Sequence, residues 1–277
     1  MKRIILIPGI LLSCLLAVPT AEAGSRDFLI CIPGSPGTSA GAAAFMTPFF
    51  RRIESLAGWP ASSTTGSYQP RYAGCMASIR SSRPGFAVMA LGVYLQHRRD
   101  MHLKVIGQVD MFAGPGRRLH LVVRKGTFRT LAELKGKKLT SNHLVEKRFL
   151  NKIMFGGKID VAQHFVLRQV SRTTKGMRDV ARGRVDATIV NDDELRTMHH
   201  RSWGRKLTVI HKSPALPGAP LVAFGRNAKR ADISALRRVI ARMCSGAQGR
   251  KLCKSSGIRS MRLATQSTYA RMIRMYR

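Results

Sequence analysis

Negative charge is scarce in this chain. Only 14 of its 277 residues are Asp or Glu, whereas 48 are Lys or Arg, and the formal net charge is +34. Paired-carboxylate catalysis therefore has few candidate residues. The basic residues are spread along the chain without a dense tail, so their charge belongs to the whole surface. This distribution keeps binding to anionic envelope polymers open as an alternative function, but it predicts no specific recognition of nucleic acid.

Several motifs of enzymes and metal sites are missing as well. The sequence has no His-Glu-x-x-His pair, no Gly-x-x-x-x-Gly-Lys-Ser/Thr loop and no Cys-x-x-Cys pair. Met101-His102 and Met198-His199-His200 are weak candidates for metal ligands, because adjacent histidines on a helix point apart. We therefore predict a protein that is not an enzyme and that holds no metal or cofactor.

Long apolar runs are confined to the amino terminus. Met1-Lys2-Arg3 is basic, residues 4–18 are mainly apolar, and Ala21-Glu22-Ala23 has the small residues of a cleavage site. The apolar run is short for a membrane span of about 20 residues. We predict a secretory signal over residues 1–23, cleavage after Ala23 and a periplasmic mature chain. Lipid attachment at Cys14 is the alternative.

Four cysteines remain in the predicted mature chain. An even number in an oxidising compartment favours disulfides, and three pairings are open. Cys244 with Cys253 is the most economical pair, since both lie in one C-terminal helical region, and Cys31 with Cys75 would then join two N-terminal segments. Four free buried thiols are the alternative.

Strand and helix patterns alternate along most of the chain. Apolar strands are expected at residues 28–32, 86–91, 103–109, 119–123, 165–170 and 186–190, with amphipathic helices between several of them. This alternation predicts an α/β fold with parallel sheets, whose ligands bind at the carboxyl ends of the strands. The turn at residues 33–39 follows the first strand, and it offers backbone amides and hydroxyls to an anion.

Two segments rich in Gly and Pro predict crossings between lobes. They lie at residues 113–116 and 213–218, where proline and glycine break regular structure. The predicted domains are residues 24–113 plus 219–277 for the first lobe and residues 114–218 for the second. The sequence thus indicates a two-lobed receptor for a small ligand.

The order of several sequence blocks is similar to that of a known family. These blocks are Cys31 to Ser39, Tyr72 to Tyr94 with Phe86-Ala87-Val88-Met89 inside it, Leu119 to Lys137, Gly183 to Ala187, and Ser213 to Pro220. Together they resemble the type 2 periplasmic solute-binding proteins of ABC transporters, in the phosphate/phosphonate branch. The resemblance implies two lobes with mainly parallel sheets flanked by helices, two crossings, and a monomer that encloses a small anionic or zwitterionic ligand for a permease.

The resemblance also implies where this ligand would be held. The contacts carried over by position come from turns after strands in both lobes: Gly37, Thr38, Ser39, Leu91, Gly92, Tyr94, Thr140, Ser141, Asn142, Asn191 and Asp192. Hydroxyls and helix amides suit a tetrahedral oxyanion, and Asp192 would suit an amine on the ligand. Each turn has a structural alternative, because Ser141 and Asn142 are also typical helix caps and Asp192 can complement a helix dipole.

Overall fold

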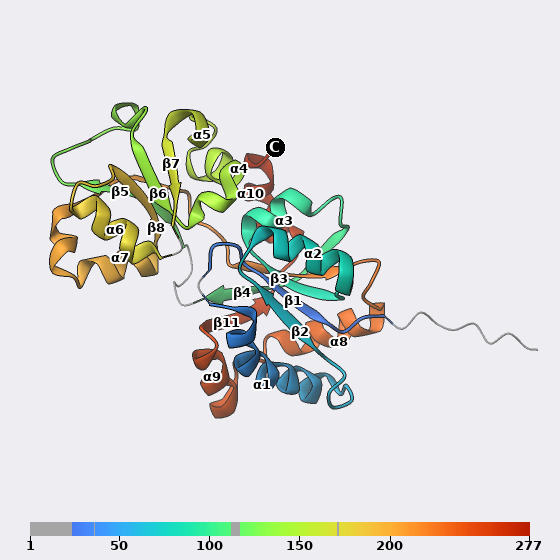
Figure 1. Cartoon of the computed structure of the whole chain (residues 1–277). Coiled ribbons are helices and arrows are strands. Elements are labelled where there is room, and N and C mark those ends of the chain that lie inside the picture. The colour runs from blue at the N-terminus through green and yellow to red at the C-terminus, as the bar shows by residue number, and fades with distance from the viewer. Residues whose placement is uncertain (1–23, 36, 112–116, 171) are drawn as a thin grey trace, which may run out of the picture.

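Two α/β lobes make up the structure, a computed structural model that describes residues 24–35, 37–111, 117–170 and 172–277 (Figure 1). The predicted signal peptide, Cys14 and the first predicted crossing lie outside the described residues. Within the described part, no helix combines the length and the apolar character that a membrane span requires. The first lobe is built on a six-stranded sheet and the second on a five-stranded sheet.

The first lobe carries helices on both faces of its sheet. Its strands lie in the order β11 (Ile258–Leu263), β4 (Leu103–Met111), β10 (Ala219–Phe224), β3 (Phe86–Met89), β1 (Phe28–Cys31) and β2 (Gly66–Gln69). One face is covered by α1 (Ser39–Ala57), α8 (Arg230–Ile240) and α9 (Gly246–Ser255), and the other by α2 (Tyr72–Ser82) and α3 (Leu91–His97). Alternation along each strand creates the two faces: Phe28 packs on the side of α1, whereas Leu29 and Cys31 pack on the side of α2.

The second lobe repeats this plan with shorter elements. Its strands lie in the order β7 (Val166–Gln169), β6 (Lys138–Ser141), β8 (Ala187–Asn191), β5 (Leu119–Arg124) and β9 (Leu207–Lys212). On one face lie α6 (Thr173–Ala181), α7 (Asp192–His199) and η4 (Ser202–Lys206), and on the other η2 (His143–Glu146), α4 (Lys147–Phe149), η3 (Leu150–Met154) and α5 (Val161–His164). A short helix, η1 (Ala132–Leu134), follows β5.

The two-lobed α/β fold is confirmed, but its sheets are mixed rather than mainly parallel. β1 pairs in parallel with β2 and β3, and β6 with β7 and β8. β5 and β10 run against their neighbours. Each of these two strands begins beside the carboxyl end of a neighbour, Leu119 against Asn191 and Ala219 against Val109. A chain that enters a lobe at that edge must run antiparallel to the strands that end there.

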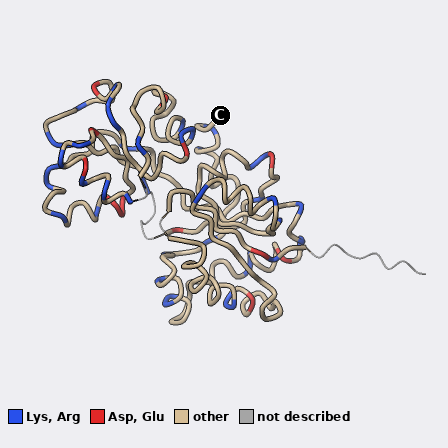
Figure 2. Tube along the Cα trace, viewed as in Figure 1, with Lys and Arg blue, Asp and Glu red and all other residues tan. Residues whose placement is uncertain are grey.

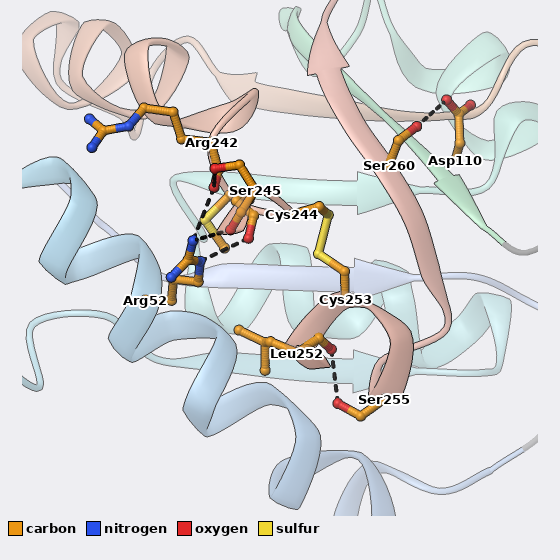
Figure 3. Close-up of a disulfide and its surroundings, with 10 residues drawn as sticks. Arg52, Asp110, Arg242, Cys244, Ser245, Leu252, Cys253, Ser255 and Ser260 are labelled. Atoms are coloured by element: carbon orange, nitrogen blue, oxygen red, sulfur yellow. Dashed lines mark hydrogen bonds between the residues drawn. A yellow bond between two sulfur atoms is a disulfide. The ribbon is translucent and has the colours of Figure 1, made fainter. Parts of the chain in front are cut away.

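Both expected disulfides form. Cys31–Cys75 joins the end of β1 to α2, and Cys244–Cys253 joins the turn after α8 to α9 (Figure 3). Beside the second bridge, Arg52 of α1 donates to the backbone oxygens of Arg242, Met243 and Ser245 at 2.8 to 3.2 Å. The disulfide and Arg52 together fix α1, the end of α8 and α9 relative to one another.

The carboxyl terminus lies where the two lobes meet. The last helices, η5 (Gln266–Tyr269) and α10 (Ala270–Met275), pack Tyr269 against Tyr94 of α3, with ring centroids 5.4 Å apart. Arg148 of the second lobe lies 4.9 Å from the ring centroid of Tyr276. Lys and Arg are spread over both lobes (Figure 2).

Candidate functional site

The turn between β1 and α1 is held by its own hydroxyl groups. Thr38 caps α1 by accepting from the backbone N–H of Gly41 at 3.1 Å, and the Ser39 hydroxyl donates to the backbone oxygen of Tyr68 at 2.6 Å. Gly37 has φ +103°, which favours glycine. The predicted hydroxyls thus stabilise the turn, while the first backbone amides of α1 point out of the helix end.

The same turn has the Gly-x-Ser-x-Gly spacing of a hydrolase nucleophile elbow, over residues 37–41. We had expected no such motif in this chain, and the sequence shows that this expectation is wrong. A nucleophilic serine needs a hydrogen-bonded base, whereas the hydroxyl of Ser39 donates to the Tyr68 carbonyl. The local geometry therefore gives the motif a structural role in starting α1.

Three predicted residues follow one another at the end of β6 in the second lobe: Thr140, Ser141 and Asn142. Thr140 donates to the backbone oxygen of Arg168 at 2.9 Å, and Ser141 donates to that of Ile189 at 2.7 Å. The Ser141 hydroxyl also accepts from the backbone N–H of His143 at 3.0 Å. These bonds fix the turn from which Asn142 projects.

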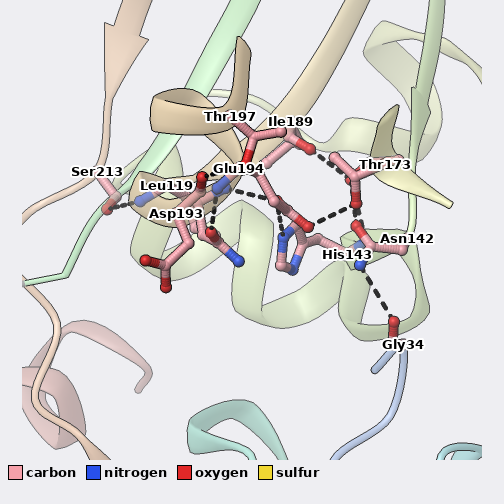
Figure 4. Close-up of polar contacts among 12 residues, drawn as sticks. Gly34, Leu119, Asn142, His143, Thr173, Ile189, Asp193, Glu194, Thr197 and Ser213 are labelled. Atoms are coloured by element: carbon pink, nitrogen blue, oxygen red, sulfur yellow. Dashed lines mark hydrogen bonds and ion pairs between the residues drawn. The ribbon is translucent and has the colours of Figure 1, made fainter. Parts of the chain in front are cut away.

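Asn142 connects the two lobes. Its side-chain nitrogen Nδ2 donates to the backbone oxygen of Gly34, in the β1–α1 turn, at 3.1 Å (Figure 4). Gly34 has φ +85°, and a Cβ at this position would lie 2.6 Å from the backbone oxygen of Asn142. Only glycine fits this approach without a shift. The β1–α1 turn of the first lobe and the turn after β6 in the second lobe therefore meet.

The end of β8 and the start of α7 form a capping box. The Asn191 side chain accepts from the N–H of Glu194 at 3.0 Å, and the Glu194 carboxylate accepts from the N–H of Asn191 at 2.8 Å. Glu194 also accepts from Thr173 at 2.5 Å and lies 3.4 Å from Nε2 of His143. Burial acts to raise the pKa of Glu194, but the contacts with His143, Thr173 and Asn191 outweigh it and hold this pKa below its usual range.

Asp192 holds the start of β5. Its carboxylate accepts from the backbone N–H of Arg118 at 2.6 Å and lies 2.7 Å from Nε2 of His120. Four of the few acidic side chains lie close enough to Arg117 to act on it electrostatically: Asp110, Asp192, Asp193 and Glu194. Burial lowers the pKa of Arg117, and these carboxylates counteract the effect. Asp192, which was predicted to pair with an amine on the ligand, is thus already hydrogen-bonded within the protein.

The first turn of α3 contains two core residues. Leu91 is 7% exposed and Tyr94 is 1% exposed, and Tyr94 packs against Tyr269. Both were expected to contact the ligand, but they lie three positions apart on a helix and share its buried side. Both side chains belong to the core in this structure, and ligand contact at these two positions stays a prediction.

Gly92 in this turn faces Glu146, which the sequence analysis did not identify. The carboxylate of Glu146 lies so close to Gly92 that a Cβ there would collide with it, and it accepts a hydrogen bond from the backbone N–H of Val93. Its Oε1 atom is buried and has no hydrogen-bond partner among the described residues. Burial raises the pKa of Glu146 to about 7, although His143 and the Val93 bond act to lower it. One feature of the sequence could have pointed to Glu146: it is one of few acidic residues in the chain, and it lies four positions after the predicted site residue Asn142.

The candidate metal ligands do not converge in the described residues. Met198 is a core residue at 1% exposed, whereas His199 and His200 are exposed. No group of three or more His, Cys, Asp or Glu side chains suited to a metal ion occurs in the part of the chain that the structure describes.

Two α/β lobes that meet at strand ends define a two-lobed binding protein. Residues 38–269 match the family described as ABC transporter, phosphonate, periplasmic substrate-binding protein. The chain therefore belongs to this periplasmic family, whose members bind substrates for transport rather than act as enzymes. A comparison with curated proteins finds no match.

Solved structures share the fold. A binding protein component of an ABC phosphonate transporter from Pseudomonas aeruginosa is 18% identical, with a TM-score of 0.68, over 91% of this chain and 85% of that one. A protein from Xanthomonas citri bound to ATP is 13% identical, with a TM-score of 0.71, over 91% and 96%. PhnD1 from Prochlorococcus marinus, in complex with methylphosphonate, is 12% identical, with a TM-score of 0.64, over 90% and 97%. At these identities the likeness establishes the type 2 periplasmic-binding-protein fold.

Proposed function

We propose that this protein captures a small phosphonate-like oxyanion between its lobes and delivers it, as a periplasmic monomer, to the permease of an ABC importer. Membership of the phosphonate-binding family supports the ligand class. The observation that carries the proposal is the contact between Asn142 and Gly34, because it joins the two turns that would hold the ligand.

The oxyanion would exchange places with this contact between the lobes. When the lobes separate, Nδ2 of Asn142 loses the Gly34 oxygen and becomes a donor for an anion. From the opposite side, the first backbone amides of α1 supply further donors, and the positive end of this 19-residue helix attracts the anion. Ser39 and Ser141 keep the two turns in shape, because their protons are bonded to carbonyl oxygens.

The carboxylates near Arg117 bear on which anions would bind. Asp192 is already bonded to Arg118 and His120, so an amine on the ligand would have to compete for it. We therefore expect methylphosphonate to bind at least as tightly as 2-aminoethylphosphonate. A ligand enclosed between the lobes should also show only a weak dependence on salt, unlike a polymer bound to the basic surface.

Calorimetry with methylphosphonate, 2-aminoethylphosphonate, phosphate and sulfate tests this function. The variant Asn142→Ala should weaken the tightest of these ligands roughly 10- to 150-fold, because a hydrogen bond to a charged group contributes about 1.5–3 kcal/mol. Asn227→Ala is the matched control: its Nδ2 also donates to a backbone oxygen, that of Pro84 at 3.0 Å, but within the first lobe. The proposal fails if none of these anions binds, or if both variants bind like the wild type.

A further inference from the structure

A large cavity lies inside the first lobe, between α1 and the sheet. Its volume is about 640 Å³, and its floor is formed by alternate residues of β1, β3 and β4, among them Ile30, Val88 and Val109. Phe28, Ile30 and Ile32 extend this floor over about 13 Å along the first strand. The cavity opens to solvent beside α1, where Gly41 and Phe45 are exposed, and an apolar hollow of this size is in the range of a ligand site.

Small residues on α1 create the cavity. The first turn of α1 presents Gly41 and Ala42 to it, and the later turns present larger side chains, from Phe45 and Met46 to Phe50 and Ile53. The floor is incompletely covered as a result: Ile30 and Val88 are only half-buried, although they lie within the sheet.

Rigid contacts hold the walls apart. Arg52 fastens α1 to the carbonyl oxygens after α8, and Cys244–Cys253 fastens α9, whose end forms the far wall (Figure 3). Glu54 of α1 accepts from the backbone N–H groups of Ser62 and Thr64 at 3.1 and 2.7 Å. α1 is thus tied down beyond the cavity on two sides, and it cannot approach the floor without breaking these bonds.

The lining of the cavity is uncharged and mainly apolar. None of the described residues that line the cavity carries a charge, in a chain with a net charge of +34. Polar groups occur at the two ends: Ser35 and Thr38 of the β1–α1 turn with Tyr68 of β2, and Ser255 and Ser256 at the end of α9. The hydroxyl oxygen of Ser256 is buried and has no hydrogen-bond partner among the described residues. This hydroxyl is unsatisfied, and a rotation of the Ser256 side chain towards the cavity would let a ligand hydroxyl bond to it.

We propose that this cavity is a second binding site, which takes one uncharged, mainly apolar molecule with a hydroxyl group at one end. The volume lies in the range of small-molecule sites. Its apolar walls suit an alkyl or aromatic body, and the lack of cations in the lining argues against an anionic head group inside it. The hydroxyl of the ligand bonds to Ser256. One end of this site borders the β1–α1 turn of the proposed oxyanion site through Gly37 and Thr38, and Ser256 lies at the other end.

Two pairs of variants test the site, with 1-decanol as the ligand and calorimetry as the readout. Ala42→Phe fills the cavity from α1, and Ala43→Phe places the same ring at an exposed position of the same helix. Ser256→Ala removes the orphan hydroxyl, whereas Ser255→Ala removes one that already donates to the backbone oxygen of Leu252 at 2.9 Å (Figure 3).

We expect one decanol per chain in the wild type, in Ala43→Phe and in Ser255→Ala. Ala42→Phe should weaken binding at least tenfold, and Ser256→Ala should weaken it about five- to tenfold, the loss expected for one hydrogen bond. Displacement of the neutral dye 1-aminoanthracene by decane, which has no hydroxyl, should be the same in Ser256→Ala and the wild type. That second measurement separates loss of the bond from loss of the fold.

Other results would overturn the proposal. They are the absence of saturable decanol binding, more than one decanol per chain, and equal binding by Ala42→Phe and Ala43→Phe. Methylphosphonate titrations of Ser256→Ala and Ser255→Ala keep the two sites distinct, because these serines lie at the end of the cavity away from the β1–α1 turn, and their loss should leave oxyanion binding unchanged. Failure of the cavity therefore leaves the proposed transport function standing, and the reverse also holds.

Discussion

Glu146→Gln should remove a pH dependence from the stability of this protein. The Glu146 carboxylate is pressed against Gly92 in the other lobe, and burial raises its pKa to about 7. In the unfolded chain its pKa returns to about 4.5. Between these two values the folded protein binds a proton that the unfolded chain does not. Stability from this group is therefore fully present below pH 4.5 and is lost as the pH rises to about 7.

The magnitude follows from the difference between the two pKa values. It corresponds to about 3 kcal/mol between pH 4.5 and pH 8, as an upper limit. Glutamine keeps an oxygen that can accept from the N–H of Val93 but carries no charge. We expect the variant to match the wild type near pH 4.5 and to be more stable than it at pH 8.

Urea unfolding at a series of pH values measures this effect. Glu133→Gln is the control, since hydrogen bonds from Arg129 and Thr130 lower the pKa of Glu133, and its loss cannot remove a decline with rising pH. Small-angle scattering should also show the wild type more compact at pH 5 than at pH 8. Parallel pH profiles of the wild type and Glu146→Gln would refute the reasoning.

Three further predictions concern the lobe contact, the C-terminal disulfide and the surface charge. Gly34→Ala places a Cβ 2.6 Å from the Asn142 backbone oxygen, so the radius of gyration should rise and oxyanion binding should weaken; unchanged scattering would contradict this. Replacing Cys244 and Cys253 by serine should lower the free energy of unfolding by about 2.7 kcal/mol, and free thiols in peptide maps of the unreduced wild type would rule the bridge out. Neutralising scattered exposed Lys and Arg should slow oxyanion association and leave dissociation nearly unchanged, as stopped-flow kinetics can check; a main effect on dissociation would place those side chains in the site.

Local sequence patterns predict most of the strands and both disulfides. Apolar runs correctly locate β1, β3 and β8, because these strands are buried along most of their length and consist mainly of apolar residues. The direction of β5 and β10 could not be predicted in this way, since it depends on which edge of a sheet the chain enters after a crossing. A strand pattern is the same in either direction.

The site is harder to predict because its contacts span long separations. The bond from Asn142 to Gly34 joins residues 108 positions apart. The family resemblance assigned the hydroxyls of both turns to a ligand, whereas the structure bonds Ser39 and Ser141 to backbone carbonyls. Glu146 went unnoticed because its burial comes from the other lobe.

The bridge between Cys31 and Cys75 connects folding with the place where the protein works. It closes a loop that contains α1, β2 and the turn with Gly34, and the two cysteines are 44 positions apart. Such a link contributes about 4 kcal/mol in the chain-entropy estimate, and it forms only in an oxidising compartment. In the reducing cytoplasm the first lobe would lack this contribution, so the newly made chain would be easier to keep unfolded for export. The family to which the chain belongs is periplasmic. Oxidation after export would then complete the lobe in the compartment where its substrate is met.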